Sequence, residues 1–432
     1  MLSKRRVMLH FPSMHKAPLS LRQPALRDLA RPLRQNHVLS EKPGFMDFDL
    51  IIIGGGLAGA SLAVALRASR LRIAVVETHL PADVPGWDSR IYAVSPENAD
   101  FLREIGAWRH LDASRINPVH AMSIRGDAGG SLEFSAYESG LPELAWIVES
   151  GRLHRELWET MRRQHNVTLL CGISPVRFSQ GAASVTVGLS DGRQANARLV
   201  VGADGVNSWV RQQAGIAATF TPYDEVGVVA NFRCERGHRN VAYQWFRPDG
   251  ILALLPLPGK MVSMVWSAPA GCAQELLALD ADSLCRRVAD ATSGELGYLK
   301  LETPAAGFPL RLMRVDTTVK SRIAVIGDAA HAIHPLSGHG INLGFKDARE
   351  LASVLNGLAP WRDPGEIAVL RGYARQRAEE PFLLQNTTHV LNRLFGTANP
   401  VLTVLRNVGL NLTDRLPVVR HALVRYAAGG RF

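Results

Sequence analysis

Three glycines spaced as Gly54-x-Gly56-x-x-Gly59 lie between an apolar run and a stretch rich in Ala and Leu. Gly54 permits a tight turn, Gly56 lets the backbone approach a pyrophosphate, and Gly59 allows a helix to pack closely on a strand. The amino end of that helix offers free N–H groups to phosphates. Glu77 ends the next apolar run, where a carboxylate accepts hydrogen bonds from a ribose and repels a 2′-phosphate. This pattern predicts a dinucleotide site; the alternative is a glycine-rich helix start without a ligand.

Two further stretches place an aspartate directly after an apolar run. Asp204 follows residues 199–203, and Asp328 follows residues 323–327. A strand would deliver Asp328 to a turn, where its carboxylate binds a sugar hydroxyl. A glycine-rich loop then leads into another helix, whose amino end would stabilise negative charge on a flavin ring. Taken alone, the Asp204 segment is better explained by an ordinary strand, turn and helix cap than by a binding site.

Three histidines, His331, His334 and His339, lie close together after Asp328. Their spacing matches no common metal-ligand pattern, and no carboxylate triad accompanies them. We therefore expect no metal site and assign these histidines a structural or flavin-proximal role. The four cysteines have no CxxC spacing, so we expect reduced thiols.

The elements that must position these groups are visible in the hydrophobic pattern. Residues 48–77 form a strand, a turn, a helix and a second strand, as in a βαβ unit. Alternating apolar residues over 226–267, separated by Pro- and Gly-containing turns, predict an inserted antiparallel sheet. A buried strand returns at 322–326. Helices are expected at the ranges 98–110, 150–165, 340–358 and most of 366–428.

The formal net charge of +10 is concentrated at the amino end. Residues 1–45 hold most of the excess, and the nearly neutral remainder has no basic stripe interleaved with aromatics, so nucleic acid binding is disfavoured. Two interpretations of residues 1–45 remain: a mitochondrial-type transit segment, or an upstream start codon before Met46. The frequent prolines favour the second.

Taken together and in this order, the three motifs resemble those of the class A flavoprotein aromatic hydroxylases, which share the para-hydroxybenzoate hydroxylase fold. The segment 238–258 (HRNVAYQWFRPDGILALLPLP), with 265–267 (VWS) and 308–310 (FPL), narrows the resemblance to the hydroxylases of ubiquinone biosynthesis. The resemblance spans residues 46–430. It implies an α/β fold: a Rossmann-like FAD-binding domain (46–220 and 313–365), an inserted antiparallel β-sheet substrate domain (221–312) and a C-terminal helical region (366–432), after a basic extension (1–45).

The resemblance also implies roles for individual residues. Residues that would hold the ADP half of FAD are Gly54, Gly56, Gly59 and Glu77. Arg90 and Arg152 would lie near the cofactor phosphates and ring, and Asp328 would bind the ribityl chain or the ribose. The isoalloxazine would be lined by Pro335, Gly338, Gly340 and Asn342. Asp204 belongs to a motif linked to both FAD and NAD(P)H. Two residues depart from the family pattern. His339 stands where Gln is usual, and Ser150 where Asn is common. Pro335 and His339 are flavin-proximal, and no side chain is assigned as a catalytic base.

The implied reaction is hydroxylation of a polyprenylated phenol on the way to ubiquinone. NAD(P)H would bind transiently and reduce FAD, and dioxygen would form a C4a-hydroperoxide that attacks the ring, with water kept out. Six residues of the inserted sheet are candidates for lining the substrate pocket, and the alternative is that they pack in the domain core. Because side chains alternate along a strand, about half of them are expected to face away from the pocket. They are Trp245, Phe246, Leu254, Pro256, Met264 and Trp266.

Other functions and locations remain open at this point. The chain could be a flavin monooxygenase of a soluble aromatic, a flavin-dependent lipid reductase, or a non-catalytic FAD-binding subunit of a biosynthetic complex. Helices within 381–428 carry apolar faces among arginines. They would serve as a membrane-surface or partner-docking face, or pack on their own domain. The expected location is the cytoplasm, including the inner face of the inner membrane, or alternatively the mitochondrion.

Overall fold

The computed structural model describes residues 45–81, 85–333, 340–395, 400–416 and 424. The chain divides into a short unit, Met1–Lys42, and a large unit, Pro43–Phe432, to which all described residues belong. Residues 1–44 of the predicted basic extension lie outside the described part of the chain, as do the predicted flavin-site residues Pro335, Gly338 and His339.

An 8-stranded sheet runs in the order β18-β19-β11-β1-β2-β8, with β10 and β9 added beside β11. The strands β19, β11, β1, β2 and β8 pair in parallel. Leu50–Ile53 and Ile73–Val76 are buried without interruption, as expected for parallel strands covered on both faces. The strands are β1 (Phe45–Ile53), β2 (Ile73–Glu77), β8 (Val167–Cys171), β9 (Pro175–Gln180), β10 (Val185–Leu189), β11 (Gln194–Gly202), β18 (Val319–Lys320) and β19 (Ile323–Val325).

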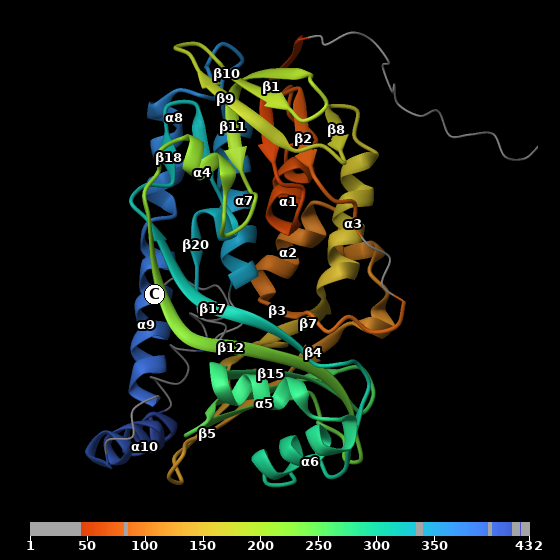
Figure 1. The fold of residues 1–432 in the computed structure, drawn as a ribbon, viewed down its shortest axis with the longest axis vertical. Coiled ribbons are helices and arrows are strands. Elements are labelled where there is room, and N and C mark those ends of the chain that lie inside the picture. Colours follow the sequence, from red (N-terminus) through yellow and green to blue (C-terminus); the bar gives the residue numbers. More distant parts are fainter. Residues whose placement is uncertain (1–44, 82–84, 334–339, 396–399, 417–423, 425–432) are drawn as a thin grey trace, which may run out of the picture. The chain divides into compact units, whose positions relative to one another are not determined.

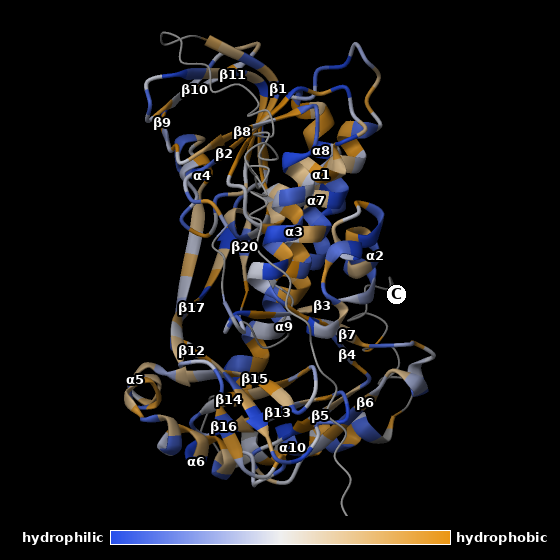
Figure 2. Cartoon of the chain, turned by 90° about the vertical axis from the view of Figure 1, so that its right-hand side faces the viewer, coloured by the Kyte–Doolittle hydropathy of each residue, from blue (hydrophilic) through white to orange (hydrophobic). Residues whose placement is uncertain are grey.

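Two apolar clusters cover the faces of this first sheet, and Figure 2 colours its inner strands as hydrophobic. One cluster packs the helices α1 (Leu57–Ala65), α2 (Pro96–Glu104), α3 (Ser150–Arg162), α7 (Gly340–Asn356) and α8 (Ile367–Gln376) against the sheet. The other contains Val210 of the short helix α4 (Trp209–Gln213) and residues of β10. The parallel sheet is therefore a buried platform with its strand ends free to carry loops.

A 9-stranded, mainly antiparallel sheet follows the order β20-β17-β12-β15-β14-β13-β5-β6, with β16 paired to β12. Its strands are β5 (Ala121–Arg125), β6 (Ser131–Ser135), β12 (Ala218–Cys234), β13 (Val241–Arg247), β14 (Gly250–Leu257), β15 (Met261–Pro269), β16 (Leu299–Leu301), β17 (Ala306–Val315) and β20 (His331–Ala332). The helices α5 (Ala270–Ala278) and α6 (Ala281–Ala291) cover one face. In Figure 1 both helices lie below this sheet, on the side away from the parallel sheet.

A third sheet of β3 (Ile91–Val94), β7 (Ala145–Glu149) and β4 (Asn117–Val119) contributes to the contact between the two larger sheets. Its last residue, Glu149, is buried and accepts hydrogen bonds from Asp88 N at 2.8 Å and from Arg115 Nε at 2.8 Å. A buried carboxylate needs such partners. They hold the segment before Arg90 in place.

The C-terminal part is helical, with α9 (Glu379–Phe395) and α10 (Pro400–Arg415) following α8. Gln385 of α9 donates from Nε2 to the carbonyl of Met313 in β17 at 2.8 Å. Within the described ranges, no helix combines the length and apolar character that crossing a bilayer demands.

The predicted α/β class with an antiparallel sheet and C-terminal helices is confirmed, and α3 and α7 begin at the expected residues, Ser150 and Gly340. The second sheet also takes β5, β6 and β20 from outside 221–312. Strand pairing between distant segments decides this membership, and no local pattern reports it. The domain boundaries stay a prediction.

The packing of α5 and α6 on the second sheet generates a stability prediction. Trp266 is fully buried in that cluster, so Trp266→Ala should lower the free energy of unfolding by about 3–5 kcal/mol. Trp361 is 83% exposed, and Trp361→Ala should change it by less than about 0.5 kcal/mol. Urea titration of both variants, followed by far-UV circular dichroism, measures the difference. Equal costs would contradict the core assignment.

Candidate functional site

The three sequence motifs meet at one edge of the parallel sheet. Gly54 follows β1, Glu77 ends β2, Asp204 follows β11 and Asp328 follows β19. These strands are neighbours and parallel, so their carboxyl ends lie at the same edge. The arrangement brings together residues separated by more than 250 positions in the chain.

The Gly54 turn lies directly against the end of β11. A Cβ on Gly54 would lie 2.4 Å from the carbonyl oxygen of Ala203, and the residue has φ +101°. A Cβ on Gly59 would lie 2.0 Å from the carbonyl oxygen of Gly54. No other residue type fits either position without moving backbone, so both glycines serve close packing.

Gly56 differs, because no atom lies within 4 Å of where its Cβ would be. It is the N-cap of α1 and makes no side-chain cap bond. Beside it, Gly55 N donates to Glu77 Oε2 at 2.6 Å, and His79 N donates to Glu77 Oε1 at 3.0 Å. Each carboxylate oxygen keeps capacity for a further donor. An open helix amino end beside a carboxylate fits the phosphates and ribose of a dinucleotide.

The first motif also touches the third. A Cβ on Gly327, which has φ +59°, would lie 3.1 Å from the Cβ of Ala58. A Cβ on Gly344 of α7 would lie 3.5 Å from that same Ala58 Cβ. Small residues on α1, α7 and the 3-10 turn η4 (Gly327–Ala329) therefore let both helix amino ends approach the turn that carries Asp328.

Asp328 is accessible to solvent, although many protein atoms lie around its carboxyl group. Burial raises the pKa of its carboxyl, and the charges of His331 and Arg90 oppose this only partly. β20, just after Asp328, pairs with β17 of the second sheet. The Asp328 turn therefore lies where the two large sheets join.

Asp204 has a buried carboxyl with Oδ2 accepting from Val210 N at 3.1 Å, whereas Oδ1 has no partner among the described residues. Burial raises the pKa of Asp204, although hydrogen bonds from Ser208 and Val210 lower it. Arg211 of the same motif donates to the carbonyls of Val206 at 2.9 Å and Ala329 at 2.9 Å. Arg211 thus ties the second motif to the third, a role that the sequence analysis missed although the Ser-x-x-Arg spacing was visible.

Arg90 and Arg152 occupy different surroundings. The Arg90 guanidinium lies 5.5 Å from the ring centroid of Tyr92 and 5.9 Å from that of Phe308, and its charge acts on Asp328. Arg152 instead pairs through Nε with Glu149 Oε2 at 3.0 Å. Arg90 is therefore close to the Asp328 turn, whereas Arg152 has a partner in β7.

Two of the residues predicted to line the isoalloxazine are described. Gly340 begins α7, with open space where a Cβ would be. The Asn342 side chain is buried, donating to Ala93 O at 2.8 Å and accepting from Ser95 N at 2.9 Å. These bonds tie α7 to the β3–α2 connection, so Asn342 offers a ligand its backbone rather than its side chain.

Asp347, which the sequence analysis did not single out, anchors the third motif. Its buried Oδ2 accepts from Gly327 N at 2.9 Å and contacts His331 Nε2 at 2.6 Å, and its Oδ1 accepts from Arg377 Nε at 2.8 Å. Burial alone would raise the pKa of Asp347, but His331 and Arg377 outweigh it and hold the pKa below its usual value. Gly327 and Asp347 lie far apart in sequence, and an Asp within a helix carries no local signal.

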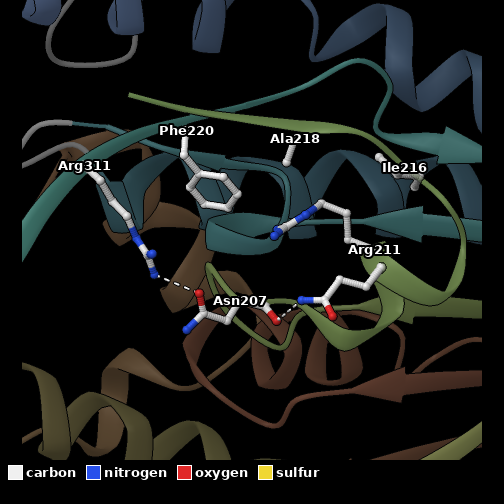
Figure 3. Close-up of a pocket in the computed structure, with 7 residues that line it drawn as sticks. Asn207, Arg211, Ile216, Ala218, Phe220 and Arg311 are labelled. Carbon is white, nitrogen blue, oxygen red and sulfur yellow. Dashed lines mark hydrogen bonds between the residues drawn. The ribbon is translucent and has the colours of Figure 1, made fainter. Parts of the chain in front are cut away.

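A cationic pocket of about 380 Å³ opens beside the second motif (Figure 3). The Phe220 ring lies between two guanidiniums, 5.7 Å from Arg211 and 5.3 Å from Arg311. Arg311 donates to Asn207 Oδ1 at 2.9 Å. Across the described ranges, no group of at least three His, Cys, Asp or Glu side chains could hold a metal ion.

The pocket candidates of the second sheet divide between its two faces. Trp245, Leu254, Met264 and Trp266 belong to the cluster with α5 and α6, the core packing that was kept as the alternative. Pro256 is buried and shares their face by strand alternation. Phe246 lies on the opposite face, its ring 3.7 Å from that of Phe395 in α9.

The face opposite α5 and α6 carries a row of other apolar side chains. Val229 pairs with Val265, and Val265 pairs with Ala253, across three adjacent strands. On the same face, Asn231 Nδ2 donates to the carbonyl of Asp88 at 2.8 Å. This is therefore the face turned toward Arg90 and the motifs. Sequence alternation identified two faces but not which one was covered.

The open position at Gly56 predicts a difference between two glycine variants. Gly56→Ala should fold normally and bind FAD at least about tenfold more weakly, because its methyl occupies the space for a pyrophosphate. Gly54→Ala should fail to fold, because its Cβ meets Ala203. Thermal melts and flavin fluorescence titration of apoprotein measure both. Wild-type FAD affinity in Gly56→Ala would refute the assignment.

The raised pKa of Asp328 predicts opposite effects on stability and binding. Stability linked to this carboxyl is present below its ordinary pKa and is lost as pH rises through the raised pKa. Asp328→Asn should therefore raise the melting temperature of the apoprotein at neutral pH, with the gain vanishing in acid. FAD affinity should fall roughly 10- to 100-fold if this carboxylate binds a sugar hydroxyl. The exposed Asp316→Asn serves as control and should change neither quantity.

Comparisons with known proteins agree with this geometry. Residues 47–381 match the family described as FAD binding domain. The chain is 31% identical over 387 residues to 3-demethoxyubiquinol 3-hydroxylase of Escherichia coli, covering 88% of this chain and 98% of that protein. It is 30% identical over 434 residues to the mitochondrial ubiquinone biosynthesis monooxygenase COQ6 of Homo sapiens. This match covers 88% of this chain and 92% of that protein.

Solved structures share the fold. PqsL of Pseudomonas aeruginosa, in complex with 2-aminobenzoylacetate, superposes with a TM-score of 0.72 at 23% identity, covering 84% of this chain and 99% of that one. The p-nitrophenol 4-monooxygenase PnpA of Pseudomonas putida superposes with a TM-score of 0.72 at 17% identity, covering 89% and 99%. With the matched domain and the full-length relatives, these likenesses show that the chain belongs to the FAD-dependent monooxygenase family that includes the ubiquinone-biosynthesis hydroxylases.

Proposed function

We propose that this protein hydroxylates the aromatic ring of a polyprenylated phenol in ubiquinone biosynthesis, using FAD, NAD(P)H and dioxygen. The observation that carries the proposal is the meeting of the Gly54 turn, Asp204 and Asp328 at one sheet edge, in a chain 31% identical to a demethoxyubiquinol hydroxylase. We propose a location in the cytoplasm, including the inner face of the inner membrane, with the mitochondrion as the alternative.

The FAD site is assigned on features of this chain. Gly56 and the amino end of α1 would bind the pyrophosphate, and Glu77 the adjacent ribose. Asp328 would bind the sugar-like chain, and the amino end of α7 at Gly340 would face the ring. The bound flavin supplies transfer of electrons from NAD(P)H to dioxygen.

The protein's own contribution is to orient these groups and to exclude water. Asp347 holds Gly327 N and His331, and so fixes the Asp328 turn. The apolar row of Val229, Ala253 and Val265 lies on the sheet face turned toward the motifs. An apolar wall suits a phenol ring and keeps water from the reacting atoms.

The pocket at Phe220 supports a transient site for NAD(P)H. An aromatic ring between two guanidiniums suits stacking of a base, and Arg311 is placed to pair with a phosphate. The pocket adjoins Asn207 in the loop after Asp204. Arg211, already bonded to two carbonyls, supports the pocket wall.

The proposal is tested by quinone-lipid analysis of a strain lacking this gene. We expect an accumulated prenylphenol that lacks one ring oxygen, with ubiquinone restored by wild-type protein. Asp328→Asn should restore it poorly, because FAD binding is weakened, whereas Asp316→Asn should restore it fully.

Other outcomes point to the alternative functions. Unchanged quinone content would defeat the pathway assignment. If the purified protein is yellow but no prenylphenol stimulates its oxidation of NAD(P)H, the protein is a non-catalytic FAD-binding subunit. Stimulation by water-soluble aromatics alone would indicate a different substrate class.

A further inference from the structure

His331 is a buried histidine at the start of β20, directly after the turn that carries Asp328. Its Nε2 lies 2.6 Å from Asp347 Oδ2. Although burial alone would raise it, His331 and Arg377 hold the pKa of Asp347 below its usual value, so this carboxyl group is ionised near neutral pH and only accepts hydrogen bonds. Nε2 therefore donates, and in the neutral ring Nδ1 is the nitrogen without a hydrogen.

The Nδ1 atom of His331 is buried and has no hydrogen-bond partner within the ranges that the structure describes. A buried polar atom without a partner destabilises a folded protein, so its presence beside a binding site calls for a functional reason. One ring nitrogen held by a carboxylate and the other left free is also the arrangement of histidines that accept protons in enzymes. These two features point to proton binding at Nδ1.

Charged groups from four elements surround this imidazole. Asp347 belongs to α7, and Asp328 belongs to the turn η4, where the charge of His331 acts on its carboxyl group. Arg314 of β17 is paired with His331 across the strands, so their side chains lie on one face. Arg377, at the end of α8, donates to Asp347 at 2.8 Å. These two carboxylates and two guanidiniums balance, so a proton on His331 would add a net positive charge.

The other charges of this cluster are fixed near neutral pH. Arg377 and Lys346 both donate to Glu380, at 2.7 Å and 2.6 Å, and although burial would raise it, these cations hold the pKa of Glu380 below its usual value. Asp328 would be kept ionised by the sugar hydroxyls of bound FAD, because hydrogen bonds to a carboxylate favour its charged form. Imidazole is the side chain that gains or loses a proton near neutral pH, so His331 is suited to proton exchange.

We infer that reduction of bound FAD draws a proton from solvent onto His331 Nδ1. The inference rests on the FAD site assigned above and is independent of which phenol is hydroxylated. Hydride transfer from NAD(P)H delivers two electrons and one proton to FAD and so leaves it with one additional negative charge. The N–H bond that forms at Nδ1 adds one positive charge, and the net charge of the site is unchanged.

Helix α7 sets the distance over which these charges interact. Gly340, at the amino end that we propose to face the ring, and Asp347, which holds His331, are separated by about two turns, or roughly 10 Å, of this helix. Two unit charges that far apart, at an effective dielectric constant of about 20, shift a protonation equilibrium by roughly tenfold. A tenfold shift corresponds to the uptake of about half a proton per FAD at the midpoint of the transition.

The test is an anaerobic redox titration of FAD-loaded, full-length protein against a reference dye, repeated between about pH 6 and about pH 8. His331→Gln keeps an N–H donor for Asp347 but cannot bind a proton. Wild-type protein should take up about one and a half protons for two electrons, and His331→Gln about one. The midpoint potential of wild type should therefore fall with pH about one and a half times as steeply. Equal slopes would overturn the inference.

The matched control is His389→Gln. His389 of α9 is partly buried and lies 3.3 Å from the Tyr223 hydroxyl, so this variant removes an imidazole without altering the contact to Asp347. It should keep the wild-type slope, and a slope as shallow as that of His331→Gln would refute the assignment to His331. Thermal melts and flavin absorbance verify that each variant folds and holds FAD.

A measurement on wild-type protein covers the case in which His331→Gln does not fold. Anaerobic reduction by NAD(P)H in weakly buffered solution at about pH 7 should remove about half a proton per FAD from solution, read with a pH-indicator dye. An unchanged dye would rule out the inference. Neither measurement uses a phenol, so failure to hydroxylate any prenylphenol would defeat the proposed function without changing either result.

Discussion

The backbone of the Gly54 turn lies so close to the end of β11 that a single Cβ would meet the carbonyl of Ala203 at 2.4 Å. Gly59 and Gly327 also allow close packing because they lack a side chain, and Gly327 approaches Ala58 of α1. These contacts between small residues draw two helix amino ends and two strand ends into one place. The positive ends of the two helix dipoles and their free N–H groups then lie at the edge where the dinucleotide would bind, α1 toward the pyrophosphate and α7 toward the ring.

Charge at this edge is arranged in two ways. Asp347 is fully buried but has three donors, and its partners hold the pKa of its carboxyl low, so it remains a fixed anion that secures the Gly327 turn. Asp204 and Asp328 have raised pKa values because burial is not fully compensated. Carboxylates short of partners in the free protein gain most when a ligand supplies donors, which suits a binding site.

The second sheet separates stability from function by its two faces. The face against α5 and α6 holds large apolar side chains such as Trp266 in a buried core. The opposite face carries the row of Val229, Ala253 and Val265, with Asn231 beside it. Beyond that sheet, α10 uses polar side chains to close an edge strand and so leaves its apolar side outward. One architecture thus supplies a cofactor edge and a proposed substrate wall.

The sequence by itself determined the parallel core, the Gly54 turn with Glu77, and the two aspartates at strand ends. These features depend on local backbone conformation and on continuous burial, which residue type and periodicity report directly. Only the tertiary structure decided that Trp266 is core, that Asn342 holds the β3–α2 connection, and that Asp347 supports the Asp328 turn. The alternation of side chains along a strand predicts two faces of a sheet but not which face the helices cover. A buried carboxylate needs hydrogen-bond donors, and these come from residues that are distant in sequence and meet only in the folded chain.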